Sequence, residues 1–251
     1  MVYVTGDCHG DFGRFDKEWF PEQSEMSRDD TVIICGDFGG IWNGGDEEEA
    51  NLEFLSKLPF TIAFCDGNHE NFTRLNKSFA EVDFHGGRAH QIAENVFHLM
   101  RGYIFEFDGK SFWVMGGASS HDIDDGILDP EDFPDVETFI YTTRKWSRQG
   151  KMFRIKNMSW WEEELPSRDE LEFGRQTLED NDNVVDFIIT HCAPQDVCSF
   201  MGFTTPDRLT NYFNDIARTV KFGRWYFGHY HTTETIMGKF ICLYDSIERI
   251  V

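Results

Sequence analysis

The sequence predicts an α/β fold that contains at least one largely parallel β-sheet. Short apolar runs rich in β-branched and aromatic residues recur along the chain, and each has the length of a strand. Most of these runs are apolar throughout, which is typical of strands buried on both faces. Helix-capping signals lie between the runs, and strands that alternate with helices indicate an α/β arrangement.

Eight runs are expected to form strands. They are Val2–Val4, Thr31–Cys35, Thr61–Cys65, Tyr103–Phe107, Ser111–Met115, Val184–Thr190, Arg224–Phe227 and Lys239–Leu243. Asp108-Gly109-Lys110 has the residues of a tight turn and is expected to join the fourth and fifth runs as a hairpin. Gly238 is expected to do the same between Thr235–Met237 and the last run.

Helices are expected in the segments between these strands. Asp46 to Lys57 is helical in pattern, and Pro59 stops it. Ser159 and Ser167 each stand three residues before a glutamate, which is the spacing of a capping box at a helix N-terminus. Thr205 is expected to cap a further helix, because the proline that follows it suits the first helical position.

The chain is interpreted as a single domain over residues 1–251, because it has no internal repeat, low-complexity tract or linker. The segment from His121 to Met158 is less regular and is expected to be a long loop or a lid. Met1 leads directly into an apolar run, and no run reaches the ~18 apolar residues of a membrane span. These features predict a cytoplasmic protein with no membrane partner, and they leave the oligomeric state open.

The overall charge is strongly negative. Lysine and arginine total 23 against 45 aspartates and glutamates, which gives a formal net charge of −22. Such a surface repels nucleic acids and anionic membranes, so a nucleic-acid partner is not expected. A small or medium phosphorylated substrate remains compatible, because bound divalent cations reverse the potential locally. The acidic runs at 46–49 and 162–164 are expected to be solvated helical faces.

Aspartate, asparagine and histidine side chains follow the ends of five of the apolar runs. They are Asp7, His9, Asp37, Asn68, His191, His229 and His231. In an α/β sheet, the carboxyl ends of the strands form the edge at which ligand sites are assembled. A mixed oxygen and nitrogen set suits Mn²⁺, Fe or Zn²⁺ and suits Ca²⁺ poorly. Seven ligands exceed the needs of one tetrahedral ion and fit two ions that share a bridging carboxylate.

Two of these blocks carry ligands at positions i and i+2. Asp7 with His9, and His229 with His231, can converge on one ion only if the backbone bends between them. The adjoining glycines are expected to permit that bend.

The ordered blocks D-x-H, G-D, G-N-H-E, a lone H and G-H-x-H resemble the calcineurin-like metallophosphoesterase superfamily from Asp7 to His231. The resemblance implies a four-layer α/β/β/α sandwich, in which two mixed β-sheets pack face to face and helices flank them. It also implies two metal sites that share the bridging ligand Asp37: one formed by Asp7, His9 and His231, the other by Asn68, His191 and His229. In the family, the histidine at the position of His69 protonates the leaving alkoxide.

The function expected from this resemblance is metal-dependent hydrolysis of a phosphoester. Two divalent or trivalent ions, most plausibly Mn, Fe or Zn, would lower the pKa of a bridging water, so that hydroxide attacks phosphorus at neutral pH. Phosphomonoesterase and phosphodiesterase activities both remain open. The alternative is a non-catalytic metal-binding scaffold of the same fold. A nuclease is a third hypothesis, and the net charge of −22 argues against it.

The sequence departs from the family pattern at one point. Gly40 and Ile41 stand where many members carry an acid, which orients the catalytic histidine, followed by an arginine. Asp46 and Asp122 are candidates for the orienting acid. The missing arginine argues against a protein phosphatase, since arginine is the usual bidentate clamp for a phosphomonoester, and the sequence does not choose a replacement. The candidates are Arg14, Arg88, Arg101, Arg144 and Arg148.

The remaining reactive residues are expected to be structural. His85, His90 and His98 lie outside the blocks, whereas His121 is balanced between a structural role and a place beside the site. The six cysteines form no C-x-x-C pair and are expected to be reduced, and four of them are expected to be small buried residues at strand ends. Cys8 is not expected to be a nucleophile, because in an extended segment its side chain points away from those of its neighbours.

Overall fold

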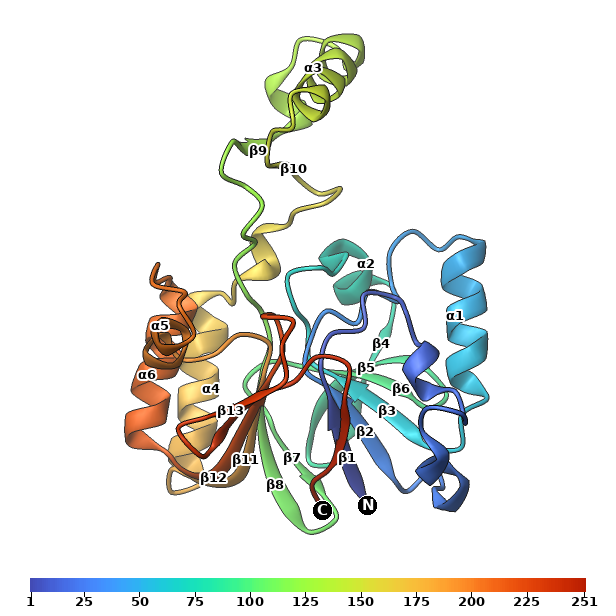
Figure 1. Cartoon of the computed structure of the whole chain (residues 1–251), viewed down its shortest axis with the longest axis vertical. Coiled ribbons are helices and arrows are strands. Elements are labelled where there is room, and N and C mark those ends of the chain that lie inside the picture. Colours follow the sequence, from blue (N-terminus) through green and yellow to red (C-terminus); the bar gives the residue numbers. More distant parts are fainter.

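The computed structural model describes residues 1–251 and has two β-sheets packed face to face with helices on the outside (Figure 1). The first sheet has the strand order β15-β1-β2-β3-β6-β5-β4. Its strands are β1 (Val2–Thr5), β2 (Thr31–Ile34), β3 (Thr61–Phe64), β4 (Ala80–Phe84), β5 (Gly87–Ala93), β6 (Val96–Leu99) and β15 (Ile247–Arg249). The four strands β1, β2, β3 and β6 run parallel, and the others are antiparallel to their neighbours, so the sheet is mixed.

The second sheet has the order β13-β14-β12-β11-β8-β7. Its strands are β7 (Ile104–Phe107), β8 (Lys110–Met115), β11 (Val184–Thr190), β12 (Lys221–Phe227), β13 (Glu234–Ile236) and β14 (Phe240–Cys242). Strands β8, β11, β12 and β14 are parallel, whereas β7 and β13 pair antiparallel with their neighbours. Both expected hairpins are present, one between β7 and β8 and the other between β13 and β14.

Three hydrophobic clusters separate four layers. The cluster between the two sheets contains Val4, Ile33 and Ile189, which come from both sheets. On the outer face of the first sheet, helices α1 (Asp46–Ser56) and α2 (Phe72–Lys77) contribute Leu55 and Leu75 to a second cluster. The outer face of the second sheet carries the third cluster, under α4 (Arg168–Asp180), α5 (Gln195–Phe200) and α6 (Arg208–Thr219). This arrangement confirms the expected α/β/β/α sandwich.

Four strands of the first sheet, β4, β5, β6 and β15, were not expected from the sequence. Strands β4 and β5 alternate polar and apolar residues and form the edge of the sheet, where β4 is largely exposed. Without a continuous apolar run, they lack the pattern of a strand buried on both faces. His85 and Gly86 make the turn between them with positive φ angles of 47° and 89°.

Two helix starts differ from the prediction. The Ser167 capping box is present at the start of α4. Ser159 caps no helix, and its hydroxyl instead accepts the Ile155 backbone N–H at 2.9 Å. Helix α6 is capped by Asp207 and not by Thr205, because the Asp207 carboxylate accepts the Thr210 backbone N–H at 2.7 Å. Short 3₁₀ turns cover Gly13–Phe15, Pro21–Glu25, Pro130–Asp132 and Glu162–Glu164.

Each acidic run contains one buried carboxylate, which corrects the expectation of fully solvated faces. Glu48 accepts the backbone N–H groups of Trp42, Asn43 and Gly44 at 2.7–2.9 Å and also pairs with a guanidinium. Glu164 accepts the backbone N–H and the hydroxyl of Ser120 at 3.0 and 2.7 Å. Both carboxylates thus hold loops that lead to the carboxyl edges of the sheets.

The segment between β8 and α4 forms an ordered arm that projects from the sandwich (Figure 1). It contains strand β9 (Gly126–Leu128), helix α3 (Val136–Arg148) and strand β10 (Phe153–Ile155), and β9 pairs parallel with β10. No residue of α3 is buried. The segment that the sequence left irregular is therefore mostly regular structure. No helix of the protein has the length and apolar character needed to cross a membrane.

All six cysteines are free and buried, as expected. Burial raises the pKa of Cys8 to about 12 and that of Cys198 to about 11, so thiolate is scarce at pH 8. We expect the folded protein to be unreactive toward a disulfide reagent such as dithionitrobenzoate at pH 8, whereas a sample in guanidinium releases six equivalents of thiolate dye. Rapid reaction of one equivalent in the native state would contradict this burial.

Candidate metal centre

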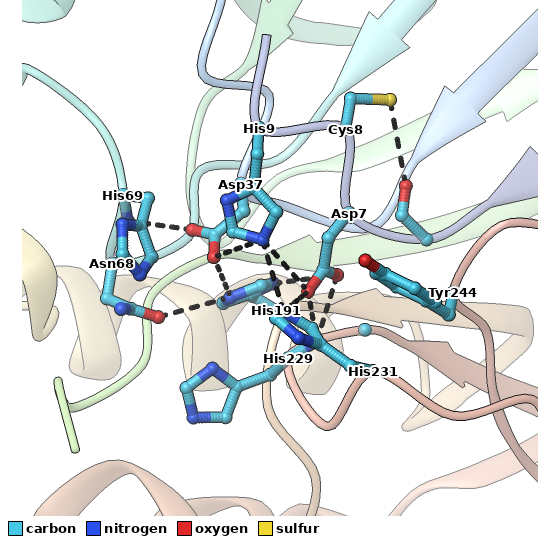
Figure 2. Close-up of polar contacts among 12 residues, drawn as sticks. Asp7, Cys8, His9, Asp37, Asn68, His69, His191, His229, His231 and Tyr244 are labelled. Atoms are coloured by element: carbon cyan, nitrogen blue, oxygen red, sulfur yellow. Dashed lines mark hydrogen bonds and ion pairs between the residues drawn. The ribbon is translucent and has the colours of Figure 1, made fainter. Parts of the chain in front are cut away.

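The seven candidate ligands lie where the carboxyl edges of the two sheets meet (Figure 2). Parallel pairing places Thr5 beside Ile34 and Ile34 beside Phe64, so the loops after β1, β2 and β3 are neighbours. These loops carry Asp7, Asp37 and Asn68. In the second sheet, Ile189 pairs with Tyr226, which brings together the loops after β11 and β12 with their three histidines.

One group of donors is formed by Asp7, His9 and His231. The Nε2 atoms of the two histidines are 3.1 Å apart. The Oδ2 atom of Asp7 lies 3.3 Å from Nε2 of His231 and 3.8 Å from Nε2 of His9. Tyr244 stacks on the His231 ring, with the ring centroids 4.8 Å apart, and was not singled out in the sequence. The donor atoms therefore converge from both sheets.

A second group surrounds His191, which is fully buried. Its Nε2 atom lies 3.3 Å from Oδ2 of Asp37 and 3.3 Å from Oδ1 of Asn68. Its Nδ1 faces the Cys35 carbonyl oxygen at 2.8 Å, which orients the ring. The His229 ring lies beside that of His191, with their centroids 4.9 Å apart.

Asp37 lies between the two groups. Its Oδ2 atom is 3.3 Å from Nε2 of His191 and 3.8 Å from Nε2 of His9. Its Oδ1 accepts the His69 backbone N–H at 2.7 Å, which holds the carboxylate in place. The buried Glu70 carboxyl accepts the Phe38 backbone N–H at 2.7 Å and so supports the same loop.

The donor separations fit metal coordination. Ligands that bind one ion at ~2.0–2.2 Å are themselves about 3.0–3.5 Å apart in octahedral or tetrahedral geometry. The distances of 3.1 and 3.3 Å in the first group and of 3.3 Å in the second lie in that range. The donors are imidazole nitrogens, carboxylate oxygens and an amide oxygen, which suit Mn²⁺, Fe and Zn²⁺.

The backbone is bent at the candidate ligands themselves. His9, Asp37, His229 and His231 have positive φ angles of 50°, 47°, 70° and 48°. The left-handed region costs a non-glycine residue roughly 1–2 kcal/mol, and such strain often gathers at functional sites. The ligand residues therefore take part in the bend themselves, together with adjoining glycines such as Gly10 and Gly36, whose φ angles are 78° and 91°.

Two glycines have another role, which is to allow close approach of a ligand carboxylate. A Cβ added to Gly67 would overlap the Asp37 carboxylate, and one added to Gly228 would overlap that of Asp7. Any side chain at these positions would displace a donor from the cluster. Close packing against these carboxylates thus explains why glycine precedes Asn68 and His229.

The cluster shifts the pKa values of its members in both directions. Burial alone would favour the neutral acid of Asp37, but the His191 imidazole holds the pKa of that carboxyl well below its usual range. Burial likewise opposes the charged form of His191, yet the Asp37 and Asp7 carboxylates raise its pKa to about 10. Burial, followed by the neighbouring His191, lowers the pKa of His229. Burial raises the pKa of Asp7, whereas the Asp37 carboxylate stays charged because positive charge lies beside it, which fits a cation site.

His69 lies at the edge of the cluster. Its ring packs edge to face with that of His9, with the centroids 5.0 Å apart. Burial, together with the positive charge of Arg154, lowers the pKa of His69 to about 4 although Asp37 opposes the shift. Arg154, from β10 of the arm, places Nη2 3.2 Å from Nε2 of this histidine, and Asp122 accepts its Nε–H at 2.6 Å.

Asp122 therefore reaches His69 through Arg154, whereas Asp46 is exposed at the start of α1. Sequence reasoning missed Arg154 because it lies in the segment that was left irregular. The available signal was the short apolar pair Phe153 and Ile155 around a single arginine. Gly40 cannot be exchanged for the family acid without rearrangement, because a Cβ there would overlap the Phe38 ring.

The other histidines divide between structure and site. His90 and His98 are buried, their Nδ1 atoms are 3.0 Å apart, and His98 also bonds Asp66 at 3.1 Å, so their expected structural role is supported. His85 lies at an exposed turn. The His121 ring lies beside that of His229, with their centroids 4.5 Å apart, so this residue borders the cluster. Cys8 points away from the cluster and bonds the Gly6 carbonyl (Figure 2).

Comparison with known proteins identifies the family of this chain. A family model described as calcineurin-like phosphoesterase matches residues 1–233. Lariat debranching enzyme A of Xenopus laevis is 25% identical over 137 residues, which are 48% of this chain and 24% of that protein. Lariat debranching enzyme of Danio rerio is 24% identical over 160 residues, which are 57% of this chain and 27% of that protein.

The matched regions thus cover about a quarter of the length of these curated relatives. The family match extends over nearly the whole chain and includes all five ligand-bearing loops. This protein belongs to the calcineurin-like phosphoesterase family.

Proposed function

We propose that this protein is a metal-dependent phosphoester hydrolase with a binuclear site, and that residues 1–251 act as one catalytic unit. The observation that carries the proposal is the position of Asp37, whose Oδ2 atom lies between His191 and His9 at 3.3 and 3.8 Å. When bound, the ions would supply an activated water and neutralise charge on the phosphoryl oxygens.

The side chains of the protein would then bind the ions, transfer a proton and orient a ligand. Asp7, His9 and His231 would hold one ion, Asn68, His191 and His229 the other, with Asp37 shared between them. His69 would transfer a proton to the leaving alkoxide, because it lies beside His9 at the edge of the donor cluster. Cys35 would keep the His191 ring oriented by accepting a hydrogen bond at its carbonyl.

A cavity of about 330 Å³ opens beside His9 and His69. Its other lining residues are Gly10, Gly39, Gly40, Trp42, Asn43, Glu47, Glu48 and Asn51. Its amide, indole and carboxylate groups suit a polar leaving group that carries no second phosphate, because the two glutamates would repel one. A small or medium phosphorylated substrate fits such a cavity.

The arm favours a second candidate substrate, a phosphodiester within a nucleic-acid strand. Arg144, Lys145 and Arg148 are exposed on α3, whereas Lys151, Arg154 and Lys156 are paired with Asp125, Asp122 and Asp129 of the same arm. Tyr141 is 68% exposed on α3. Cations combined with an exposed aromatic ring are typical of surfaces that bind single strands. The names of the two relatives, which refer to lariats, agree with this candidate, so net charge alone does not exclude nucleic acid.

A metal-reconstituted substrate screen tests the proposal. The protein as purified is analysed for metals and assayed with aryl monoesters, aryl diesters, cyclic phosphodiesters and a single-stranded oligonucleotide. We expect about two metal equivalents per chain and hydrolysis of at least one class. Removal of the metals by a chelator should abolish turnover and lower the thermal midpoint, because the strained ligand loops lose their compensation. Mn²⁺ or Zn²⁺ should restore both.

The same screen separates the alternatives. A protein that holds two ions and cleaves none of these esters would be the non-catalytic scaffold. Cleavage of the oligonucleotide that falls steeply with salt would favour the nucleic-acid candidate, since phosphate contacts are salt-dependent. Full activity after exhaustive chelation, with no metal remaining, would refute a metal-dependent mechanism.

A further inference from the structure

Arg154 is a buried cation in a largely exposed arm. It lies on β10, where 8% of the residue is exposed, whereas α3 of the same arm has no buried residue. The arm begins after β8, and β8 runs parallel to β11, which ends at Thr190, directly before His191. Topology therefore brings the base of the arm to the sheet edge that holds the candidate metal centre.

Two of the three nitrogens of the Arg154 guanidinium donate hydrogen bonds to residues at the base of the arm. Nε donates to Oδ1 of Asp122 at 2.6 Å, and Nη1 donates to the Ser159 carbonyl at 2.9 Å. Nη2 faces only the His69 ring, at 3.2 Å from Nε2 and 3.5 Å from Nδ1. A guanidinium nitrogen with two N–H groups thus points at the His69 ring at the edge of the donor cluster.

The other arginines considered for this role are occupied or distant. Arg14 donates to the carbonyls of Asp7, Gly6 and Tyr244 and holds the loop after β1. Arg101 is paired with Asp66. The remaining three lie elsewhere, Arg88 on the edge of the first sheet and Arg144 and Arg148 on α3.

We propose that Arg154 is the phosphate clamp of this protein and that its Nη2 donates to a non-bridging oxygen of the phosphoryl group. This inference rests on the proposed function and names a binding residue for it. A phosphoryl oxygen is an anionic acceptor, so it makes a stronger hydrogen bond with guanidinium than an imidazole does. The ligand class is a tetrahedral oxyanion: a phosphoester or inorganic phosphate.

The clamp belongs to the arm and not to the loop after β2, where Gly40 and Ile41 stand. The seating of the arm therefore sets the position of the clamp. Asp122 acts as a positioning residue, because its carboxylate fixes the direction in which Nη2 points. Substrate affinity is thus coupled to the arm through a single side chain.

The test uses metal-loaded protein and two readouts, titration calorimetry with inorganic phosphate and steady-state kinetics with the best ester from the screen. For Arg154→Met we expect phosphate affinity to fall ~10–100-fold and KM to rise similarly, as for loss of a charge-assisted hydrogen bond. The phosphate affinity and KM of Arg154→Lys should lie between those of Arg154→Met and the wild type, because lysine keeps the positive charge but lacks the paired N–H donors of guanidinium. Asp122→Asn should raise KM with a smaller effect on kcat.

Arg88→Met is the matched control, since it removes an arginine from the surface and should change neither readout. Metal content and circular dichroism are measured for every variant. If Arg154→Met does not fold, Arg154→Lys carries the test, with an expected loss of affinity of ~5-fold or more.

Phosphate affinity within twofold of wild type in both Arg154 variants would overturn the clamp. That result leaves the proposed function standing if the wild type still hydrolyses esters. Conversely, a wild type without turnover whose phosphate affinity depends on Arg154 would refute the hydrolase and support the anion site.

Discussion

Asp37→Asn is expected to lower kcat/KM by ~10³-fold or more and to reduce the bound metal to about one equivalent or less, since Lewis-acid stabilisation supplies several kcal/mol. Asparagine keeps the shape of the side chain but removes its charge. It also replaces one oxygen by an amide nitrogen that cannot bind a cation. The effect is large because the Asp37 carboxylate is shared by both donor groups.

The measurements are kcat/KM with the aryl phosphate that the wild type hydrolyses fastest, and the metal content of the purified variant by elemental mass spectrometry. Asp83→Asn is the matched control, because the side chain of Asp83 is 92% exposed and removal of its charge leaves the cluster intact. Turnover by Asp37→Asn at the wild-type rate, with two ions retained, would show that this carboxylate is no bridging ligand.

Arg101→Met is expected to destabilise the protein by about 3–5 kcal/mol, as for removal of one partner of a buried ion pair. The side chains of Arg101 and Asp66 are 6% and 1% exposed, and Arg101 Nε donates to Asp66 Oδ2 at 2.9 Å. Arg101 also donates to the Glu163 carbonyl at 2.6 Å, which ties β6 to the base of the arm. Methionine fills similar volume and leaves Asp66 buried without its cation.

Urea unfolding at pH 7 gives the free energy of unfolding of the variant and of two companions. Arg88→Met removes an exposed ion pair and should leave that free energy unchanged. The double variant Asp66→Asn with Arg101→Met should recover part of the loss, since no uncompensated charge then remains buried. A loss for Arg101→Met no larger than that for Arg88→Met would mean that the buried pair is not a main support of the fold.

The strands that carry the candidate site could be predicted from the sequence because they are buried on both faces. Such strands are continuous apolar runs, as in Val2–Val4 and Val32–Cys35, and the polar residue after each run marks its carboxyl end. Strands β4 and β5 could not be predicted in this way. Strand β4 is the exposed edge of the sheet, β5 pairs with it, and both strands mix polar residues with apolar ones.

The sequence by itself determined the family, the layered α/β class and the residues that gather at the sheet edges, because these depend on local pattern and on the order of motifs. Which charged groups form contacts between segments far apart in the sequence could be learned only from the folded structure. Arg154 lies 85 residues from His69 and reaches it only because the arm returns to the sheet edge. Burial of Glu48 and Glu164 within acidic runs was decided in the same way, by loops whose N–H groups needed an acceptor. Contacts of this kind depend on packing between distant segments. Periodicity and spacing within one segment do not predict them.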